Sequence, residues 1–94
     1  SAYPFITRDI AMFVPTEISE EKAKDLIFNT LNKNAGDLLV KGPDLFDMFE
    51  KNGKKSIAFR MVFQSNDRTL SDEEVNSFMN ELYKVVKLEN WEVR

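Results

Sequence analysis

The dipeptide Asn52-Gly53 constrains the fold of this chain more than any other feature of its sequence. A two-residue type I′ hairpin turn needs a positive φ at both central residues, and Asn and Gly tolerate that conformation best. Residues 45–50 (LFDMFE) precede the pair and residues 54–63 (KKSIAFRMVF) follow it. Both runs have the aromatic content and the alternation that are typical of strands. The sequence therefore predicts an antiparallel hairpin that turns at this dipeptide.

The position of the turn also predicts the register of the hairpin. The expected pairs are Phe49 with Ser56, Met48 with Ile57, Asp47 with Ala58, Phe46 with Phe59, and Leu45 with Arg60. Because side chains alternate between the two faces of a sheet, one set is expected in the core: Phe46, Met48, Ile57 and Phe59. The other face is then expected to carry Leu45, Asp47, Phe49, Ser56, Ala58 and Arg60.

A strand and a helix are expected before the hairpin. Residues 7–14 (TRDIAMFV) alternate, and Pro15 ends the run. Ser19 is a suitable N-cap before acidic residues, and Gly36 is a suitable stop. Between them runs an apolar stripe with helical spacing: Ala23, Leu26, Ile27, Thr30 and Leu31.

A second helix and a short last strand are expected after the hairpin. Ser71 and Glu74 form a capping box, and the stripe that follows is Val75, Phe78, Met79, Leu82 and Val86. Residues 91–94 (WEVR) form the last strand. With right-handed crossovers, this order predicts an α+β fold, the ferredoxin-like βαββαβ arrangement. Its four-stranded antiparallel sheet has two helices on one face, central first and third strands, and an edge second strand that suits Pro43.

Composition removes several classes of site. The 94 residues contain no Cys and no His, which excludes disulfides, thiolate metal sites and the commonest general base. No apolar run approaches the roughly 20 residues that a membrane-spanning helix needs, and no signal peptide is visible. The net charge of −3 argues against a purely electrostatic nucleic-acid binder. The length predicts one domain over residues 1–94. Because the chain starts at Ser1 and not at Met, we expect this domain to be excised from a longer protein.

The sheet face without helices is the candidate site, and we call it the helix-free face. Its expected members are Asp9, Ala11, Phe13, Leu45, Asp47, Phe49, Ser56, Ala58, Arg60, Val62, Glu92 and Arg94. An exposed Phe49 beside small Ser56 and Ala58 makes a platform on which a base can stack for about 1–3 kcal/mol. Asp47 can accept hydrogen bonds from a base edge. Single-stranded RNA loops are bound by this combination of stacking and edge contacts.

Less specific interpretations of the same residues stay open. Phe49 packs under a neighbouring domain in one of them, and Phe13 makes a subunit contact in another. Arg60 and Asp47 form a solvated ion pair in a third. Lys54 and Lys55 can simply keep the hairpin soluble and protect the sheet edge.

Four motifs resemble a known family. They are RDIA (residues 8–11), LFDMF (45–49), GKKSIAFR (53–60) and RTLSDEEVN (68–76). In this order they resemble the ferredoxin-fold anticodon-binding domain that closes the beta subunit of bacterial phenylalanyl-tRNA synthetase. The resemblance covers nearly the whole chain, and the ending WEVR fits the family's habit of finishing near an arginine.

The resemblance implies an RNA-binding site on the helix-free face. In the family an aromatic residue, usually Tyr and here Phe49, stacks on an anticodon base, and the aspartate at Asp47 hydrogen-bonds a base. Ser56, Ala11 and Arg94 complete the contact surface. Together with Ala58 and Arg60 from the parity argument, the expected RNA-binding residues are Ala11, Asp47, Phe49, Ser56, Ala58, Arg60 and Arg94.

The resemblance also implies the larger setting. The domain is non-catalytic and holds no cofactor, whereas ATP and magnesium serve the full enzyme elsewhere. The implied partners are the anticodon loop of phenylalanine tRNA, the rest of the beta subunit and the alpha subunit, in a heterotetramer of two alpha and two beta chains. The implied location is the cytoplasm, with no membrane contact.

Three rival functions share this strand order. A generic RNA-recognition domain needs outward aromatic residues on its third strand, whereas Ile57 and Phe59 have the parity of the core. A small enzyme such as an acylphosphatase would need a phosphate-binding loop, and no Gly-rich loop is present. A subunit-interaction module would use Phe13, Leu45 and Phe49 as a protein contact.

Overall fold

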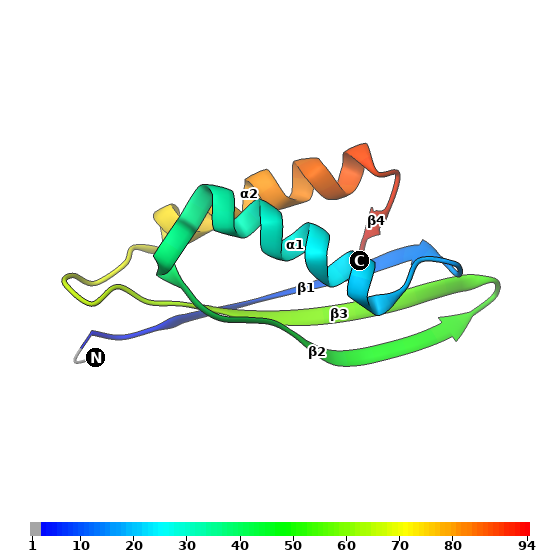
Figure 1. Ribbon diagram of the computed structural model, residues 1–94, viewed down its shortest axis with the longest axis horizontal. Coiled ribbons are helices and arrows are strands. Elements are labelled where there is room, and N and C mark those ends of the chain that lie inside the picture. The colour runs from blue at the N-terminus through cyan, green and yellow to red at the C-terminus, as the bar shows by residue number, and fades with distance from the viewer. Residues whose placement is uncertain (1–2) are drawn as a thin grey trace.

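The computed structural model describes residues 3–94 and has the predicted ferredoxin-like α+β architecture (Figure 1). Its elements are, in chain order, β1 (Ile6–Pro15), α1 (Glu20–Ala35), the 3-10 turn η1 (Gly36–Leu38), β2 (Leu39–Lys51), β3 (Lys54–Phe63), α2 (Asp72–Leu88) and β4 (Glu92–Val93). The strands pair antiparallel in the order β2-β3-β1-β4, so β1 and β3 are central as predicted. Both helices lie on one side of the sheet (Figure 1).

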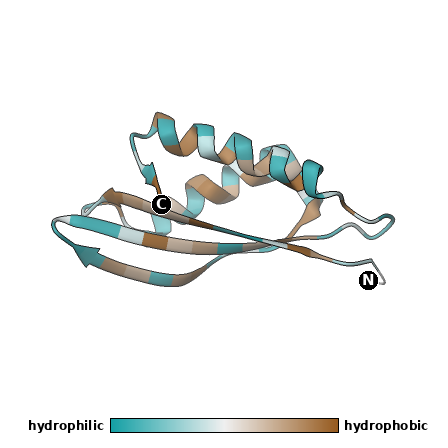
Figure 2. Ribbon diagram, turned by 180° about the vertical axis from the view of Figure 1, so that it is seen from behind, coloured by the Kyte–Doolittle hydropathy of each residue, from teal (hydrophilic) through white to brown (hydrophobic). Residues whose placement is uncertain are grey.

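The core lies between the helices and the sheet. Its largest buried side chains include Ile10, Met12, Phe59 and Phe63 from the sheet, Ile27 and Leu31 from α1, and Val75, Leu82 and Val86 from α2. Both helical stripes therefore face the sheet as predicted, and hydrophobic and hydrophilic residues alternate along both helix ribbons in Figure 2. Neither helix in residues 3–94 combines the length and the apolar character that a membrane crossing requires.

The expected helix caps are present. The Ser19 hydroxyl accepts a hydrogen bond from the backbone N–H of Lys22 (N to Oγ, 3.0 Å). Ser71 and Glu74 form the capping box at the start of α2. Gly36, with φ 56°, ends α1 in the left-handed region that glycine adopts without strain.

The hairpin turns at Asn52-Gly53 with φ values of 53° and 77°, as a type I′ turn requires. The pairs Phe49 with Ser56, Met48 with Ile57 and Asp47 with Ala58 are confirmed. Beyond them, a bulge between Leu45 and Asp47 shifts the register by one residue. The predicted partners of Phe59 and Arg60 are therefore wrong.

The bulge changes which β2 side chains are buried. Phe59 pairs with Leu45, and Arg60 pairs with Asp44. Leu45 is half-buried and packs against the core, contrary to its predicted place on the helix-free face. Phe46 is 51% exposed and Met48 is 47% exposed, so neither is a core residue as predicted. The extra residue in the bulge reverses the alternation beyond it, and the edge position of β2 leaves Met48 partly uncovered.

Strand β2 is longer than the predicted residues 45–50, because it begins at Leu39. Gly42 brings the two strands close together in this added part. It has φ 92°, and a Cβ built on it would lie 2.4 Å from the backbone oxygen of Arg60. Only glycine fits this close approach. Pro43 follows on the edge strand, as expected.

The last strand is shorter than the predicted residues 91–94. Strand β4 contains only Glu92 and Val93, which pair with Phe13 and Met12. Trp91 is buried in the core. The backbone N–H of Arg94 still donates to the carbonyl oxygen of Ala11 (2.8 Å), and this bond holds the arginine beside β1.

Candidate functional site

The sheet pairing arranges the helix-free face in three rows across the strands. The first row contains Phe13, Ser56 and Phe49; the second contains Ala11, Ala58 and Asp47; and the third contains Asp9, Arg60 and Asp44. All of the predicted RNA-binding residues except Arg94 therefore belong to these rows, and Arg94 reaches the first row from the end of β4. Ile57 and Phe59 are fully buried on the opposite side, which removes the outward aromatic residues that a generic RNA-recognition motif needs.

The first row is organised around the guanidinium of Arg94. Its Cζ lies 5.6 Å from the ring centroid of Phe13 and 5.3 Å from that of Phe49. Its Nη1 donates to the hydroxyl of Ser56 (2.9 Å). Ser56 lies on the predicted face but is only 1% exposed, so its hydroxyl contacts Arg94 and is covered from solvent. The arginine and both rings form one cation–π cluster, in which Phe49 is 38% exposed.

The second row is flat and carries one acceptor. Ala58 is buried, Ala11 is half-buried and Asp47 is exposed. Within residues 3–94, the carboxylate of Asp47 makes no hydrogen bond or ion pair. It is therefore available to accept hydrogen bonds from a ligand, as predicted, one strand position from Phe46 and two from Phe49.

The third row contains an ion pair between β1 and β3. Nε and Nη2 of Arg60 donate to the two carboxylate oxygens of Asp9 at 2.8 and 3.0 Å. This hydrogen bonding lowers the pKa of Asp9 below its usual 3.8 and raises the pKa of Arg60 above its usual range. The alternative pairing of Arg60 with Asp47 is wrong, because Asp9 lies directly opposite Arg60 on the neighbouring strand.

The bulge adds an aromatic residue to this face that alternation alone does not predict. The Cζ of Arg60 lies 4.9 Å from the ring centroid of Phe46, so this ring is on the helix-free side. The only sequence signal was the adjacent apolar pair Leu45 and Phe46, of which either could face the core. The hairpin turn and strict alternation favoured Phe46, and the bulge reversed that choice.

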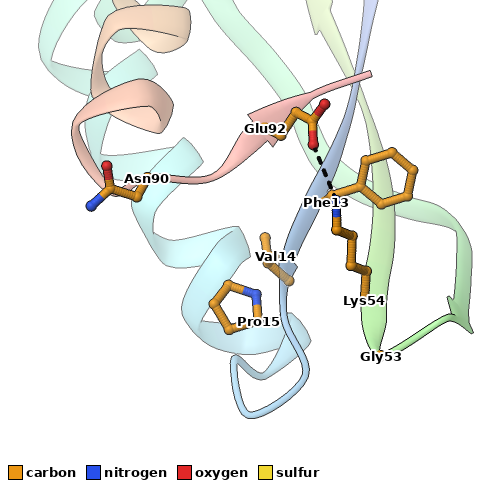
Figure 3. A pocket seen from close by; sticks show the side chains of 7 residues that line it. All are labelled: Phe13, Val14, Pro15, Gly53, Lys54, Asn90 and Glu92. Atoms are coloured by element: carbon orange, nitrogen blue, oxygen red, sulfur yellow. Dashed lines mark ion pairs between the residues drawn. The ribbon is translucent and has the colours of Figure 1, made fainter.

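The two hairpin lysines have different roles. Lys54 is on the helix-free side, where its Nζ lies 3.7 Å from an oxygen of Glu92 and 5.7 Å from the ring centroid of Phe13. The close-up shows Lys54 and Glu92 meeting beside Phe13 at the edge of a shallow pocket (Figure 3). The Nζ of Lys55 instead donates to the carbonyl oxygen of Ile18 (2.7 Å), so it ties the hairpin to the start of α1.

A second hollow of about 500 Å³ lies next to this pocket. It is lined by Phe13, Phe49, Lys51, Asn52, Lys54, Glu92 and Arg94. Its walls combine aromatic rings with cationic side chains, which suits a planar ligand that carries negative charge. Within residues 3–94, no group of three or more acidic side chains is arranged to hold a metal ion.

Known proteins resemble this chain over nearly all of its length. Residues 1–94 match the family described as "Ferredoxin-fold anticodon binding domain". A phenylalanine–tRNA ligase beta subunit from Carboxydothermus hydrogenoformans is 38% identical over 93% of this chain and 11% of that protein. The beta subunit from Trichormus variabilis is 40% identical over 87% of this chain and 10% of its own length. A chloroplastic beta subunit from Porphyra purpurea is 36% identical over the whole chain and 13% of its own length.

The chain thus spans about a tenth of the length of the curated relatives that it matches. The matched family is one of binding domains, so this segment is a non-catalytic part of proteins that are named as an enzyme subunit. The matching residues, the strand order and the helix-free face agree with the resemblance seen in the sequence motifs. The chain belongs to the ferredoxin-fold anticodon binding domain family.

Proposed function

We propose that this chain is the anticodon-binding domain at the C-terminus of a phenylalanine–tRNA ligase beta subunit, and that residues 1–94 act as one domain. Its helix-free face binds the anticodon loop of phenylalanine tRNA. The observation that carries this proposal is the arrangement of Phe49, Asp47 and Arg94 on one side of the sheet, where Asp47 has no ion-pair or hydrogen-bond partner among residues 3–94. Family membership supports the same ligand.

Each residue of the face has a distinct role in the proposal. Phe49 stacks on an anticodon base, and Asp47 accepts hydrogen bonds from a base edge. Ala11 and Ala58 have small side chains, which keep the second row of the face flat beside the ring of Phe49. Ser56 acts through Arg94, because its hydroxyl holds the guanidinium. Arg94 supplies a planar cation for stacking or for a phosphate contact, and Arg60, which is paired with Asp9, supplies one for stacking.

The larger setting of the domain is also a proposal. In the whole ligase, this domain recruits and discriminates tRNA, while other parts activate phenylalanine with ATP and magnesium and transfer it to the tRNA. Its neighbours are the rest of the beta subunit and the alpha subunit, in a heterotetramer of two alpha and two beta chains. The proposed location is the cytoplasm.

The decisive experiment is a titration of this 94-residue chain with two RNA hairpins. One hairpin carries the anticodon loop of phenylalanine tRNA, and the other has the same stem with the three anticodon bases replaced. We expect weak binding that prefers the first hairpin. Asp47→Ala should reduce that preference, whereas Asp25→Ala, an exposed aspartate on α1, should leave it unchanged. Equal affinity for both hairpins would instead indicate a general RNA binder, and no binding to either would refute the proposal.

A further inference from the structure

The bulge in β2 creates a second planar surface on the helix-free face. Phe46 lies at the bulge, is 51% exposed, and contacts the guanidinium of Arg60 at 4.9 Å from its ring centroid. The two hydrogen bonds from Arg60 to Asp9 hold that guanidinium in place. A ring and a planar cation are therefore held together with about half of each side chain exposed.

Packing of the core does not account for this arrangement. Leu45 packs against the core, whereas Phe46 is not among the residues that do so. Phe46 is also not a single exposed apolar residue, because Met48 and Phe49 on the same edge strand are exposed as well, and such an apolar edge favours a bound partner. The Phe46–Arg60 pair has the components that bind nucleobases in single-stranded RNA, which stack on aromatic rings and on guanidinium planes.

This second surface is well separated from Phe49. Phe46 and Phe49 are three residues apart on β2, which corresponds to roughly 10 Å at about 3.3 Å per residue. Asp47 and Ala58 lie between them. Successive bases of a stacked strand are only about 3.4 Å apart, so neighbouring stacked bases cannot reach both rings. Bases turned out of the stack, as in loops that proteins bind, can do so.

We propose that Phe46 and Arg60 form a second base-stacking site, which binds a different nucleotide of single-stranded RNA from the one that stacks on Phe49. The inference rests on the proposed function of the helix-free face in RNA binding. Because Asp9 neutralises Arg60, the contact is a stacking contact rather than a phosphate contact. The RNA then follows β2, with one unstacked base at each ring and Asp47 between them.

The test uses the hairpin that carries the anticodon loop of phenylalanine tRNA, with 2-aminopurine substituted at one loop position at a time. The fluorescence of this base depends on how it is stacked, so it changes when the base leaves or joins a stacking partner. Phe46→Ala is expected to weaken binding about 5- to 150-fold, the range expected for one stacked base. It should also change the fluorescence of a loop position that Phe49→Ala leaves unaffected.

Matched variants separate stacking from other roles. Phe28→Ala removes a comparably exposed ring from α1 and should change neither measurement. Phe46→Leu keeps apolar bulk without a planar ring, and Arg60→Lys keeps the charge without a planar group, so both should weaken binding. Thermal melts of each variant establish that the domain stays folded.

Each outcome decides between the two proposals. If Phe49→Ala weakens binding and Phe46→Ala does not, the second site is refuted while the proposed function stands. If neither variant changes affinity, the helix-free face is not the RNA site. If both variants change the fluorescence of one and the same base, the rings form a single site. If Phe46→Leu and Arg60→Lys bind like the unchanged chain, apolar bulk and charge suffice, and stacking is refuted.

Discussion

Replacing Phe49 with alanine separates a role in RNA stacking from a role in packing, because the structure allows both effects to be estimated. The matched substitution is Phe59→Ala, on the neighbouring strand and the opposite face of the sheet. Phe49 is 38% exposed, whereas Phe59 is fully buried. We therefore expect Phe59→Ala to lower stability more than Phe49→Ala does, and Phe49→Ala to weaken RNA binding more than Phe59→Ala does.

The expected loss of stability follows from the covered surface. About three-fifths of Phe49 is covered, and burying a whole Phe side chain contributes about 1.5–3 kcal/mol, so Phe49→Ala should cost about 1–2 kcal/mol. For a domain of this size, each kcal/mol lowers the Tm by about 4–8 °C. Phe59→Ala leaves a cavity in the core and should cost about 3–5 kcal/mol.

The expected loss of RNA affinity has the opposite order. Phe49→Ala removes one stacking ring and should weaken anticodon-hairpin binding by about 1–3 kcal/mol. Phe59→Ala should leave the affinity of the remaining folded fraction nearly unchanged. Phe49→Tyr keeps an aromatic ring at this position and should bind at least as well as the unchanged chain.

The assay combines thermal melts with fluorescence-anisotropy titrations of the three variants, at a temperature where each is folded. If the chain serves a phenylalanine–tRNA ligase as proposed, Phe49→Ala in that enzyme should impair the use of tRNA and leave amino-acid activation unaffected. The reasoning is refuted if Phe49→Ala destabilises the domain as much as Phe59→Ala does while its RNA affinity is retained.

Three further predictions follow from charges and backbone geometry. The helix-free face carries few cations, so RNA binding should depend only weakly on salt. A plot of the logarithm of the binding constant against the logarithm of salt concentration should have a slope shallower than about −2. A steeper slope in anisotropy titrations would indicate many more phosphate contacts. Gly42→Ala should lower the Tm more than Gly36→Ala, because both have positive φ but only the Cβ at Gly42 meets the backbone of Arg60; equal losses in thermal melts would contradict the close approach. The lowered pKa of Asp9 means that its ion pair stabilises the fold above the usual value of 3.8 and stops doing so as the pH falls through the lower folded value. Urea melts of Asp9→Asn should therefore show less loss of stability on acidification than the unchanged chain, and identical pH profiles would argue against the pair.

The sequence predicted the part of the site that lies next to the turn. Asn52-Gly53 has little choice of conformation, and the residue pairs from the turn as far as Asp47 with Ala58 follow directly. Asp47 and Phe49 were therefore assigned to the correct face. The helix stripes and caps were equally predictable, since local spacing and short-range hydrogen bonds determine them.

The remaining parts depend on long-range contacts that no local pattern contains. The bulge arises where β2 is held by the turn at one end and by the approach of Gly42 to Arg60 at the other. Alternation cannot indicate which residue becomes the extra one, so Phe46 was assigned to the wrong face. The burial of Ser56 under Arg94 joins residues 38 positions apart. The Asp9–Arg60 pair likewise depends on the neighbouring strand.

The guanidinium between the two rings of the first row has a consequence for the thermodynamics of binding. In the unbound domain, Arg94 already contacts Phe13 and Phe49. When a base replaces Arg94 at Phe49, the ring exchanges one planar partner for another. The measured affinity is then the difference between the base contact and the arginine contact. An exposed cation–π contact contributes about 0.5–1 kcal/mol, and Phe49→Ala removes it from the free state as well. A titration of that variant therefore understates the strength of base stacking by about this amount, and a base that displaces Arg94 leaves its charge free to contact the RNA backbone.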